Sequence, residues 1–142
     1  MRRIYTGILL LLAGIVLTPL HSQPPQTVEV SISLDQRQDP PQILVNPENI
    51  TIYVQDRVEW RIEGDSSDTV MIDFATAEGV RGPFEASNQE DNRTRGRYES
   101  RANNRIRTQP AAQQGEWKYN IIWDTAGGQR YELDPIVTVR GR

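Results

Sequence analysis

The side chains that most often perform chemistry in proteins are nearly missing from this sequence. It contains no Cys and one His, His21, which stands at the edge of an apolar N-terminal segment. Catalysis by a Ser–His or Cys–His pair needs an imidazole or a thiol, and zinc sites are built mainly from the same groups. Catalysis by such a pair is therefore excluded for residues 23–142, and a zinc site is not expected there. A Ser–Lys pair is the remaining variant, but the only Lys, Lys118, is expected on the solvated face of a strand.

Carboxylates are the remaining side chains that could bind a metal ion or act as catalytic acids. The segment from Asp65 to Asp68, with the sequence DSSD, has oxygens suited to Ca²⁺, which takes about six to eight of them. The same residue types form ordinary turns by bonding to nearby backbone amides, and the sequence favours such a turn. The pairs Glu90-Asp91 and Glu132 with Asp134 suit glycoside hydrolysis only at a separation of about 5 to 10 Å, which spacing alone does not establish.

Guanidinium groups gather in one polar segment, residues 85–114. Six Arg side chains stand there among Asn, Gln, Ser and Thr: Arg93, Arg95, Arg97, Arg101, Arg105 and Arg107. Guanidinium recognises carboxylate, phosphate or sulfate through paired donors, so these residues are candidates for binding an anionic polymer or an acidic protein surface. The alternative is a long solvated loop that contains one short edge strand around residues 105–108.

Charge is unevenly distributed along the chain. Residues 23–92 carry 4 Arg or Lys against 14 Asp or Glu, a net charge of −10, whereas residues 93–142 carry 10 against 5, a net charge of +5. If strands of both parts lie side by side, they attract each other within one fold. A basic binding surface is the alternative, but the balance does not make nucleic acid an expected partner.

Period-two alternation of apolar and polar residues indicates strands in the first half of the chain. It covers residues 27–35, 43–45, 50–54, 58–62 and 70–74, with breakers at residues 39–41 and 46–47. Gln55-Asp56 predicts a tight turn, and the polar residues 63–68 predict a second connection. Segments 50–54, 58–62 and 70–74 are therefore expected to form two hairpins.

The C-terminal third predicts a further hairpin and a kinked strand. Trp117, Tyr119, Ile121 and Trp123 alternate on one face, and residues 124–129 have the composition of a hairpin turn. The return strand, residues 131–139, is interrupted by Asp134-Pro135. It is expected to kink or change partner there and to run along a sheet edge.

These patterns together predict the fold class. No segment shows a sustained apolar stripe of helical period. The expected fold is all-β, an antiparallel two-sheet Greek-key sandwich of about seven strands with a long polar loop at 85–114. The aromatic residues Trp60, Trp117, Tyr119 and Trp123 are expected in its core.

The first 22 residues have the order of a signal peptide. Arg2 and Arg3 precede an apolar run at residues 8–17, and Thr18-Pro19 and the small residue Ser22 follow. The run is shorter than the about 20 residues of a spanning helix, so cleavage near Ser22 and export to a bacterial periplasm or the cell exterior are expected. An uncleaved N-terminal anchor is the alternative. Residues 23–142 are expected to form one domain without a membrane span.

Two motifs resemble those of cupredoxins, the blue-copper proteins. Residues 50–60, ITIYVQDRVEW, are similar to the family's apolar strand that meets a Gly-Asp-type turn and continues as Val-x-Trp. Residues 115–121, GEWKYNI, are similar to its Gly-x-Tyr-x-Phe or Tyr-x-Cys strand. The resemblance covers both halves of residues 23–142 and implies a cupredoxin-like sandwich.

The copper ligands of that family have been replaced. Copper there is held by two imidazoles and a thiolate, usually with a weak axial Met. By the resemblance, Asp68 stands where the first His is expected and Ile121 where the Cys is expected, while the hairpin at residues 124–129 contains neither His nor Met. The resemblance therefore implies a domain without a metal or another cofactor.

The expected function is non-catalytic binding by an exported, metal-free cupredoxin-like module, with an unidentified ligand. One alternative is a structural or assembly component of a cell-envelope complex, in which the edge strand at residues 131–139 adds to a partner's sheet. A carboxylate-based hydrolase is the third alternative. The oligomeric state does not follow from the sequence.

Overall fold

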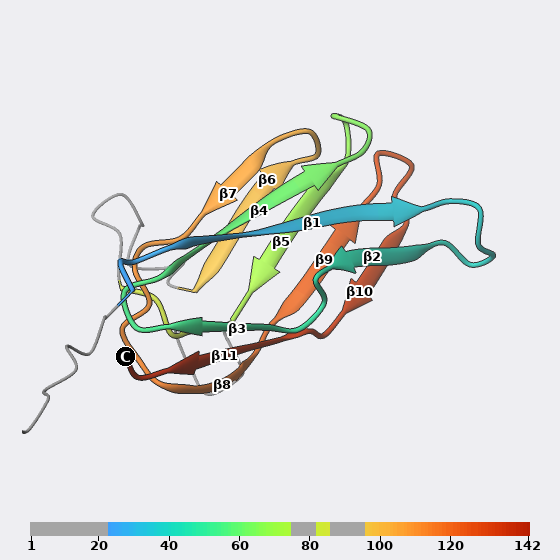
Figure 1. The fold of residues 1–142 in the computed structure, drawn as a ribbon. Coiled ribbons are helices and arrows are strands. Elements are labelled where there is room, and N and C mark those ends of the chain that lie inside the picture. The colour runs from blue at the N-terminus through green and yellow to red at the C-terminus, as the bar shows by residue number, and fades with distance from the viewer. Residues whose placement is uncertain (1–22, 75–81, 86–95) are drawn as a thin grey trace, which may run out of the picture.

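The structure, a computed structural model, describes residues 23–74, 82–85 and 96–142, and these ranges contain strands but no helix (Figure 1). The predicted all-β class is therefore confirmed. The strands are β1 (Thr27–Asp35), β2 (Gln42–Asn46), β3 (Ile50–Tyr53), β4 (Arg57–Glu63), β5 (Thr69–Asp73), β6 (Arg97–Arg101), β7 (Arg105–Arg107), β8 (Gly115–Lys118), β9 (Asn120–Asp124), β10 (Arg130–Leu133) and β11 (Ile136–Arg140).

These strands form three sheets within the described ranges. Their orders are β2-β1-β4-β7, β10-β9-β5-β6 and β3-β11-β8. The two four-stranded sheets pack face to face, which brings Trp60 of β4 against Phe74 and Tyr119 from the opposite layer. Most pairings are antiparallel, but β1 pairs with β4 and β3 pairs with β11 in parallel. The sandwich is thus mixed, not purely antiparallel as predicted.

The chain passes between sheets within two of the long strands predicted from alternation, residues 117–123 and 131–139, and at the predicted break at residues 46–47. β2 pairs with β1, whereas β3 pairs with β11. β8 pairs with β11, whereas β9 pairs with β5 and β10. The chain bends between the two members of each pair, which is how strands pass from one packed sheet to another. This explains why the structure has more strands than the sequence predicts.

The predicted strand at residues 131–139 confirms one prediction and corrects another. The chain changes partner at Pro135, as expected, because β10 pairs with β9 and β11 lies between β3 and β8. Of these two strands, β10 lies on a sheet edge and β11 does not. β11 is central in its sheet, and its Val137 side chain is fully buried. The prediction that the whole of residues 131–139 lies on an edge is therefore wrong for its second half.

The two hairpins predicted between residues 50 and 74 are also wrong. β3, β4 and β5 lie in three different sheets, so the connections between them cross from layer to layer. Asp56 holds the first connection, because its Oδ2 accepts a hydrogen bond from Tyr53 N at 2.9 Å. Each strand has one apolar face, and both arrangements bury that face. Alternation alone cannot distinguish a hairpin from a crossing.

The predicted long loop at 85–114 contains two strands in its described part. The short strand expected at 105–108 is β7, and β6 was not predicted. Tyr98 of β6 is half-buried, while Ala102 and Ile106 are buried in the core. β6 and β7 belong to opposite four-stranded sheets. A few apolar residues among many Arg side chains are therefore enough to anchor both strands.

An aromatic cluster occupies the centre of the core. The Trp60 ring lies 5.8 to 6.4 Å from those of Phe74, Phe84, Tyr98 and Tyr119, and Phe74 stacks on Tyr119 at 4.9 Å. Trp60, Tyr119 and Trp123 are buried as predicted, whereas Trp117 is only half-buried. Aromatic pairs at such distances add stabilisation beyond the area that they bury.

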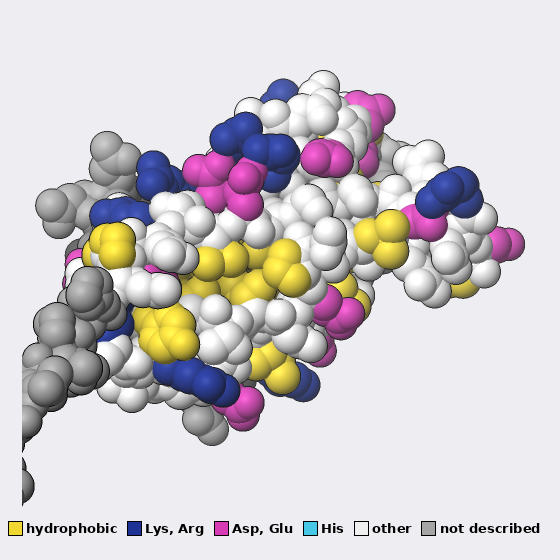
Figure 2. Space-filling view, viewed as in Figure 1, with side chains coloured by type: hydrophobic (Ala, Val, Ile, Leu, Met, Phe, Trp, Pro, Cys, Tyr) yellow, Lys and Arg dark blue, Asp and Glu magenta, His cyan; other side chains and the backbone are white. Residues whose placement is uncertain are grey.

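Apolar side chains are visible on one face of the molecule between β1 and β3 (Figure 2). β2 pairs only with residues 31–35 of β1, and β3 turns away to pair with β11. The first half of β1 therefore has a strand neighbour, β4, on one side only among the described residues. Val28 and Val54 are half-buried, and Tyr53 is 41% exposed.

Candidate functional site

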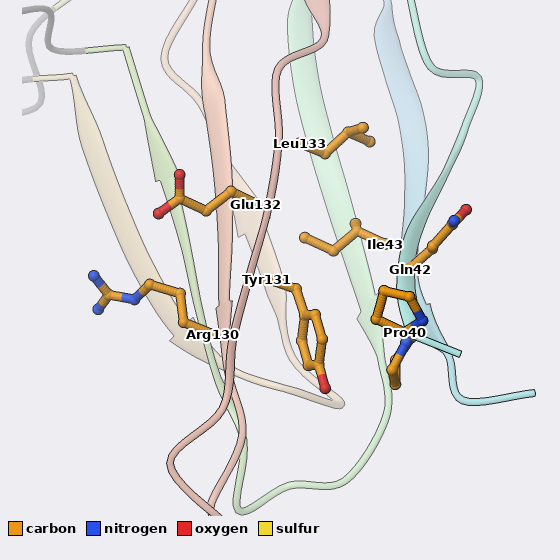
Figure 3. Close-up of a pocket in the computed structure, with 8 residues that line it drawn as sticks. Pro40, Gln42, Ile43, Arg130, Tyr131, Glu132 and Leu133 are labelled. Carbon is orange, nitrogen blue, oxygen red and sulfur yellow. The ribbon is translucent and has the colours of Figure 1, made fainter. Parts of the chain in front are cut away.

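A cleft separates the edge strands of the two four-stranded sheets on one side of the sandwich. β2 ends one sheet and β10 ends the other, and the two strands do not pair with each other. The hollow between them, here called the edge cleft, has a volume of about 510 Å³. Its lining residues are Pro40, Pro41, Gln42, Ile43, Arg130, Tyr131, Glu132 and Leu133 (Figure 3).

Apolar side chains face the interior of the edge cleft. Ile43 and Leu133 extend into the space between the strands, with the Tyr131 ring and Pro40 beside them (Figure 3). Arg130 and Glu132 point away from this space, as does Gln42 on the other side. Strand alternation explains the division, because Tyr131 and Leu133 share the inward face of β10 while their neighbours face outward. Backbone edges and hydrocarbon therefore form the cleft.

A second hollow adjoins the edge cleft at the end of the sandwich where β9 turns into β10. This apex hollow has a volume of about 420 Å³ and shares Pro41 and Tyr131 with the edge cleft. Its other lining residues are Leu34, Gln36, Asp65, Asp68, Thr125, Ala126, Gly127 and Gln129. The two hollows together are called the lateral groove below.

Hydrogen bonds hold the polar groups of the apex hollow. The buried Asp68 carboxylate accepts hydrogen bonds from Trp123 Nε1 at 2.9 Å and from Ala126 N at 3.0 Å. The Tyr131 hydroxyl donates to Gln129 Oε1 at 2.9 Å. These bonds fix the turn after β9 against the connection between β4 and β5. The wall of the hollow is thus held in a fixed shape.

Asp65 forms the turn that the sequence favoured over a calcium loop. Its Oδ1 accepts hydrogen bonds from the Ser67 backbone N at 2.9 Å and from the Ser67 hydroxyl at 2.7 Å. These bonds, the hydroxyl bond first, hold the pKa of the Asp65 carboxyl below its usual value. Neither Asp65 nor Asp68 has an ion pair with a described Arg or Lys. The apex end of the lateral groove is therefore acidic.

The structure brings together two of the three positions that the cupredoxin resemblance singled out. Asp68 and the turn at 124–129 meet through the hydrogen bond to Ala126. Ile121 is fully buried and pairs with Ile72, whereas the neighbour of Asp68, Thr69, pairs with Asp124. Ile121 is therefore separated from the apex by about 10 Å along β9. Within the described ranges no group of three or more His, Cys, Asp or Glu side chains can hold a metal ion.

The Arg residues predicted to bind anions are not gathered at one described site. Arg97 pairs with Asp73 at 3.0 Å, Arg105 pairs with Glu59 at 2.9 Å, and Arg107 donates to the Thr27 hydroxyl at 3.1 Å. Arg101 is exposed and has no ion pair or hydrogen bond of its side chain with a described residue. Arg93 and Arg95 lie outside the described residues. Because β6 and β7 belong to opposite layers, their Arg residues are divided between two faces.

Three ion pairs join the acidic part of the sequence, residues 23–92, to the basic part, residues 93–142. Asp73–Arg97, Glu59–Arg105 and Asp56–Arg142 each link an acid of residues 23–92 with a base of residues 93–142. The predicted attraction within one fold is therefore present. The Arg side chains of the first two pairs are exposed, and such pairs contribute only about 0 to 1 kcal/mol each, so these two assist strand placement more than overall stability. The Asp56–Arg142 pair is largely buried.

The carboxylate pairs proposed for hydrolysis do not form part of the groove interior. Glu132 points away from the edge cleft (Figure 3), and Asp134 is exposed. The pair Glu90-Asp91 lies outside the described residues. Sequence reasoning did not identify the groove residues Ile43, Tyr131 and Leu133 as a site, because their alternation is that of ordinary core strands.

Among the residues that the structure describes, no helix is long and apolar enough to cross a membrane. No family model matches the chain, and no curated protein matches it.

Proposed function

We propose that this protein is an exported, non-catalytic, metal-free binding module of cupredoxin-like architecture and that its ligand occupies the lateral groove. The observation that carries the proposal is that two adjoining hollows share Pro41 and Tyr131 in their walls. Ligand sites are concave and combine apolar side chains with a few fixed polar groups. The apolar side chains of the edge cleft and the hydrogen-bonded polar groups of the apex hollow provide these features.

Binding accounts for the groove better than catalysis does. The Asp68 carboxylate is occupied by two N–H donors, and the Tyr131 hydroxyl is occupied by Gln129. These hydrogen bonds use both groups to fix the shape of the site. A general base must instead face the proton that it removes from a substrate. The absence of Cys and of His beyond His21 supports the metal-free assignment, because copper prefers thiolate and imidazole donors.

Amide chemical-shift mapping of the isotope-labelled protein tests this proposal. The probes are a synthetic peptide of alternating Thr and Val and a mixture of chitin-derived and cellulose-derived oligosaccharides. At least one probe should shift the amides of residues 42–43 and 129–133 together. Shifts scattered over the surface, or no shifts with any probe, would overturn the proposal. Titration with Cu²⁺ should give no strong visible absorption band.

Assembly into an envelope complex is the second candidate, and the position of β10 favours it. β10 is an edge strand, and on its groove side no described strand pairs with it. A substitution in β11, such as Val137→Pro, does not test this idea, because Val137 is fully buried in a central strand. Size-exclusion chromatography of an envelope extract that contains the protein tests whether it is part of a larger complex. Permanent comigration with a larger complex favours assembly, whereas release on dilution favours reversible binding.

A further inference from the structure

Both long walls of the edge cleft are strand edges. β2 and β10 are the outermost strands of their sheets on this side, and no described strand pairs with either of them across the cleft. Their backbone N–H and C=O groups on that side make no ladder hydrogen bonds to a described strand. An extended polypeptide that adds to such an edge gains backbone hydrogen bonds, and the pockets beneath it select its side chains.

The floor of the cleft suits alternating apolar side chains. A strand presents every second side chain to the same face. Ile43 and Leu133 extend into the cleft, and the Tyr131 ring lies beside them (Figure 3). Arg130 and Glu132 point away, so no charged side chain of β10 obstructs this floor. Apolar side chains of an added strand would therefore be removed from water at the floor.

Charge distinguishes the two ends of the lateral groove. The apex hollow contains Asp65 and Asp68, and neither carboxylate is paired with a described cation. The nearby bases are already engaged, because Arg37 pairs with Asp35 and Arg130 pairs with Asp124. A basic side chain of a ligand would meet uncompensated negative charge at this end. An acidic side chain would be repelled.

We infer that the groove binds an extended segment of a partner polypeptide, which pairs with the edge of β10, places apolar side chains over the floor and directs a Lys or Arg toward Asp65 and Asp68. This inference rests on the proposed binding function and names the ligand class. The groove fits an oligosaccharide less well. It offers one aromatic platform, Tyr131, whose hydroxyl is already bonded to Gln129.

Two matched peptides test the inference on the full exported protein. One is an acetylated and amidated peptide of alternating Thr and Val that ends in Lys, and the other ends in Glu. The Lys peptide should bind about tenfold more tightly at low salt, and this preference should diminish as salt is raised. Its binding should slow hydrogen exchange of the amides in β10 while leaving those of β7, an edge strand on the other side of the same sandwich, unchanged.

Variants of the protein test whether the preference for the Lys peptide over the Glu peptide arises in the groove. Asp65→Asn keeps the oxygen that accepts the Ser67 bonds and removes the charge, so the preference for Lys over Glu should fall by at least about threefold. Glu63→Gln is the matched control, because Glu63 is an exposed carboxylate of β4 that does not line the groove. It should leave the preference unchanged. Leu133→Ser should weaken both peptides, with thermal unfolding used to confirm that the variant is folded.

The outcomes separate this inference from the proposed function. If an oligosaccharide shifts the groove amides and neither peptide does, the function stands and the polypeptide inference is overturned. Equal affinity for the two peptides, or protection of a strand other than β10, also overturns the inference. If no probe perturbs the groove, both fail.

Discussion

At the residue scale, buried polar side chains fall into two kinds. Asp68 accepts two hydrogen bonds, which join Trp123 to the turn after β9. The Tyr119 hydroxyl and Trp60 Nε1 are buried without a hydrogen bond of good geometry to a described residue. A buried polar group that is hydrogen-bonded stabilises the folded state. A buried polar group without a hydrogen bond destabilises it, because its hydrogen bonds to water are lost on folding and not replaced.

Replacing Asp68 should therefore be destabilising. Asp68→Ala leaves the Trp123 indole N–H and the Ala126 N–H without their acceptor, and we expect a loss of about 2 to 4 kcal/mol in the free energy of unfolding. Urea unfolding followed by Trp fluorescence measures it. Asp65→Ala is the control, since Asp65 is exposed and bonds only within its own turn. Similar losses for both variants would contradict the role given to Asp68.

Tyr119 predicts a loss of stability at alkaline pH. Burial raises the pKa of Tyr119 to about 12 from its ordinary value of 10.0, with the nearby Trp60 N–H opposing the shift in part. The folded state therefore holds the proton more tightly. Stability from this group is complete below pH 10 and declines by about 2 to 3 kcal/mol as pH rises toward 12.

The variant Tyr119→Phe isolates that contribution. It removes a hydroxyl that makes no hydrogen bond of good geometry to a described residue, so its stability at pH 7 should stay within about 1 kcal/mol of the natural protein. Between pH 10 and 12 it should lose less stability than the natural protein, as measured by urea unfolding at each pH. Parallel decline of the two proteins would show that other groups cause the alkaline loss.

At the element scale, adjoining strands of one predicted segment have different surroundings. β10 lies on a sheet edge, and β11 lies between two neighbours with Val137 and Val139 buried. The sequence correctly placed the break at Pro135, because Pro interrupts a ladder locally. It could not show that the second half is central, because this depends on β3 and β8, which are distant in the chain.

Hydrogen exchange should separate these two strands. Amides of β11 that bond to β3 or β8 should exchange only through extensive unfolding, whereas those of β10 should open locally and exchange more than about tenfold faster. Residue-resolved exchange in the unliganded protein measures both rates. Equal protection of β10 and β11 would indicate that the open edge is covered in solution.

The Arg residues of β6 also differ in a testable way. Arg97 is paired with Asp73, while Arg101 has no such partner among the described residues. If an anionic surface is bound here, Arg101→Gln should lower the salt needed to elute the protein from a sulfonate resin more than Arg97→Gln does. An equal or reversed effect would argue against a role for the unpaired guanidinium.

At the scale of the whole molecule, the opposite charges of the two parts of the sequence support one interleaved fold. Bases of residues 93–142 pair with acids of residues 23–92 on both layers and at the turn that contains Asp56. These contacts require strands from both parts to lie side by side. The uneven charge of the sequence therefore does not by itself indicate a basic binding surface.

Export is tested on the whole chain. If residues 1–22 act as a cleaved leader, expression of the full sequence should give a product in the periplasm or medium whose intact mass corresponds to a start near Gln23. Substituting acidic residues for Arg2 and Arg3 should reduce export. A product that keeps its N-terminal segment and sediments with membranes would instead favour the anchored alternative.

The sequence by itself determined that this protein is built of strands and that residues 23–142 have no thiolate or imidazole for a metal. Both follow from local information, namely the period-two alternation and the residue types. It also located the turn at 124–129 and the break at Pro135, because turn chemistry is local.

Only the tertiary structure decided which strands pair and where a ligand could bind. The same alternation buries an apolar face whether β3 and β4 form a hairpin or cross between layers, so pairing depends on contacts between distant segments. The lateral groove likewise depends on contacts between segments that are distant in the sequence. Ile43 and Leu133 meet there only because β2 and β10 each end a sheet on the same side of the sandwich.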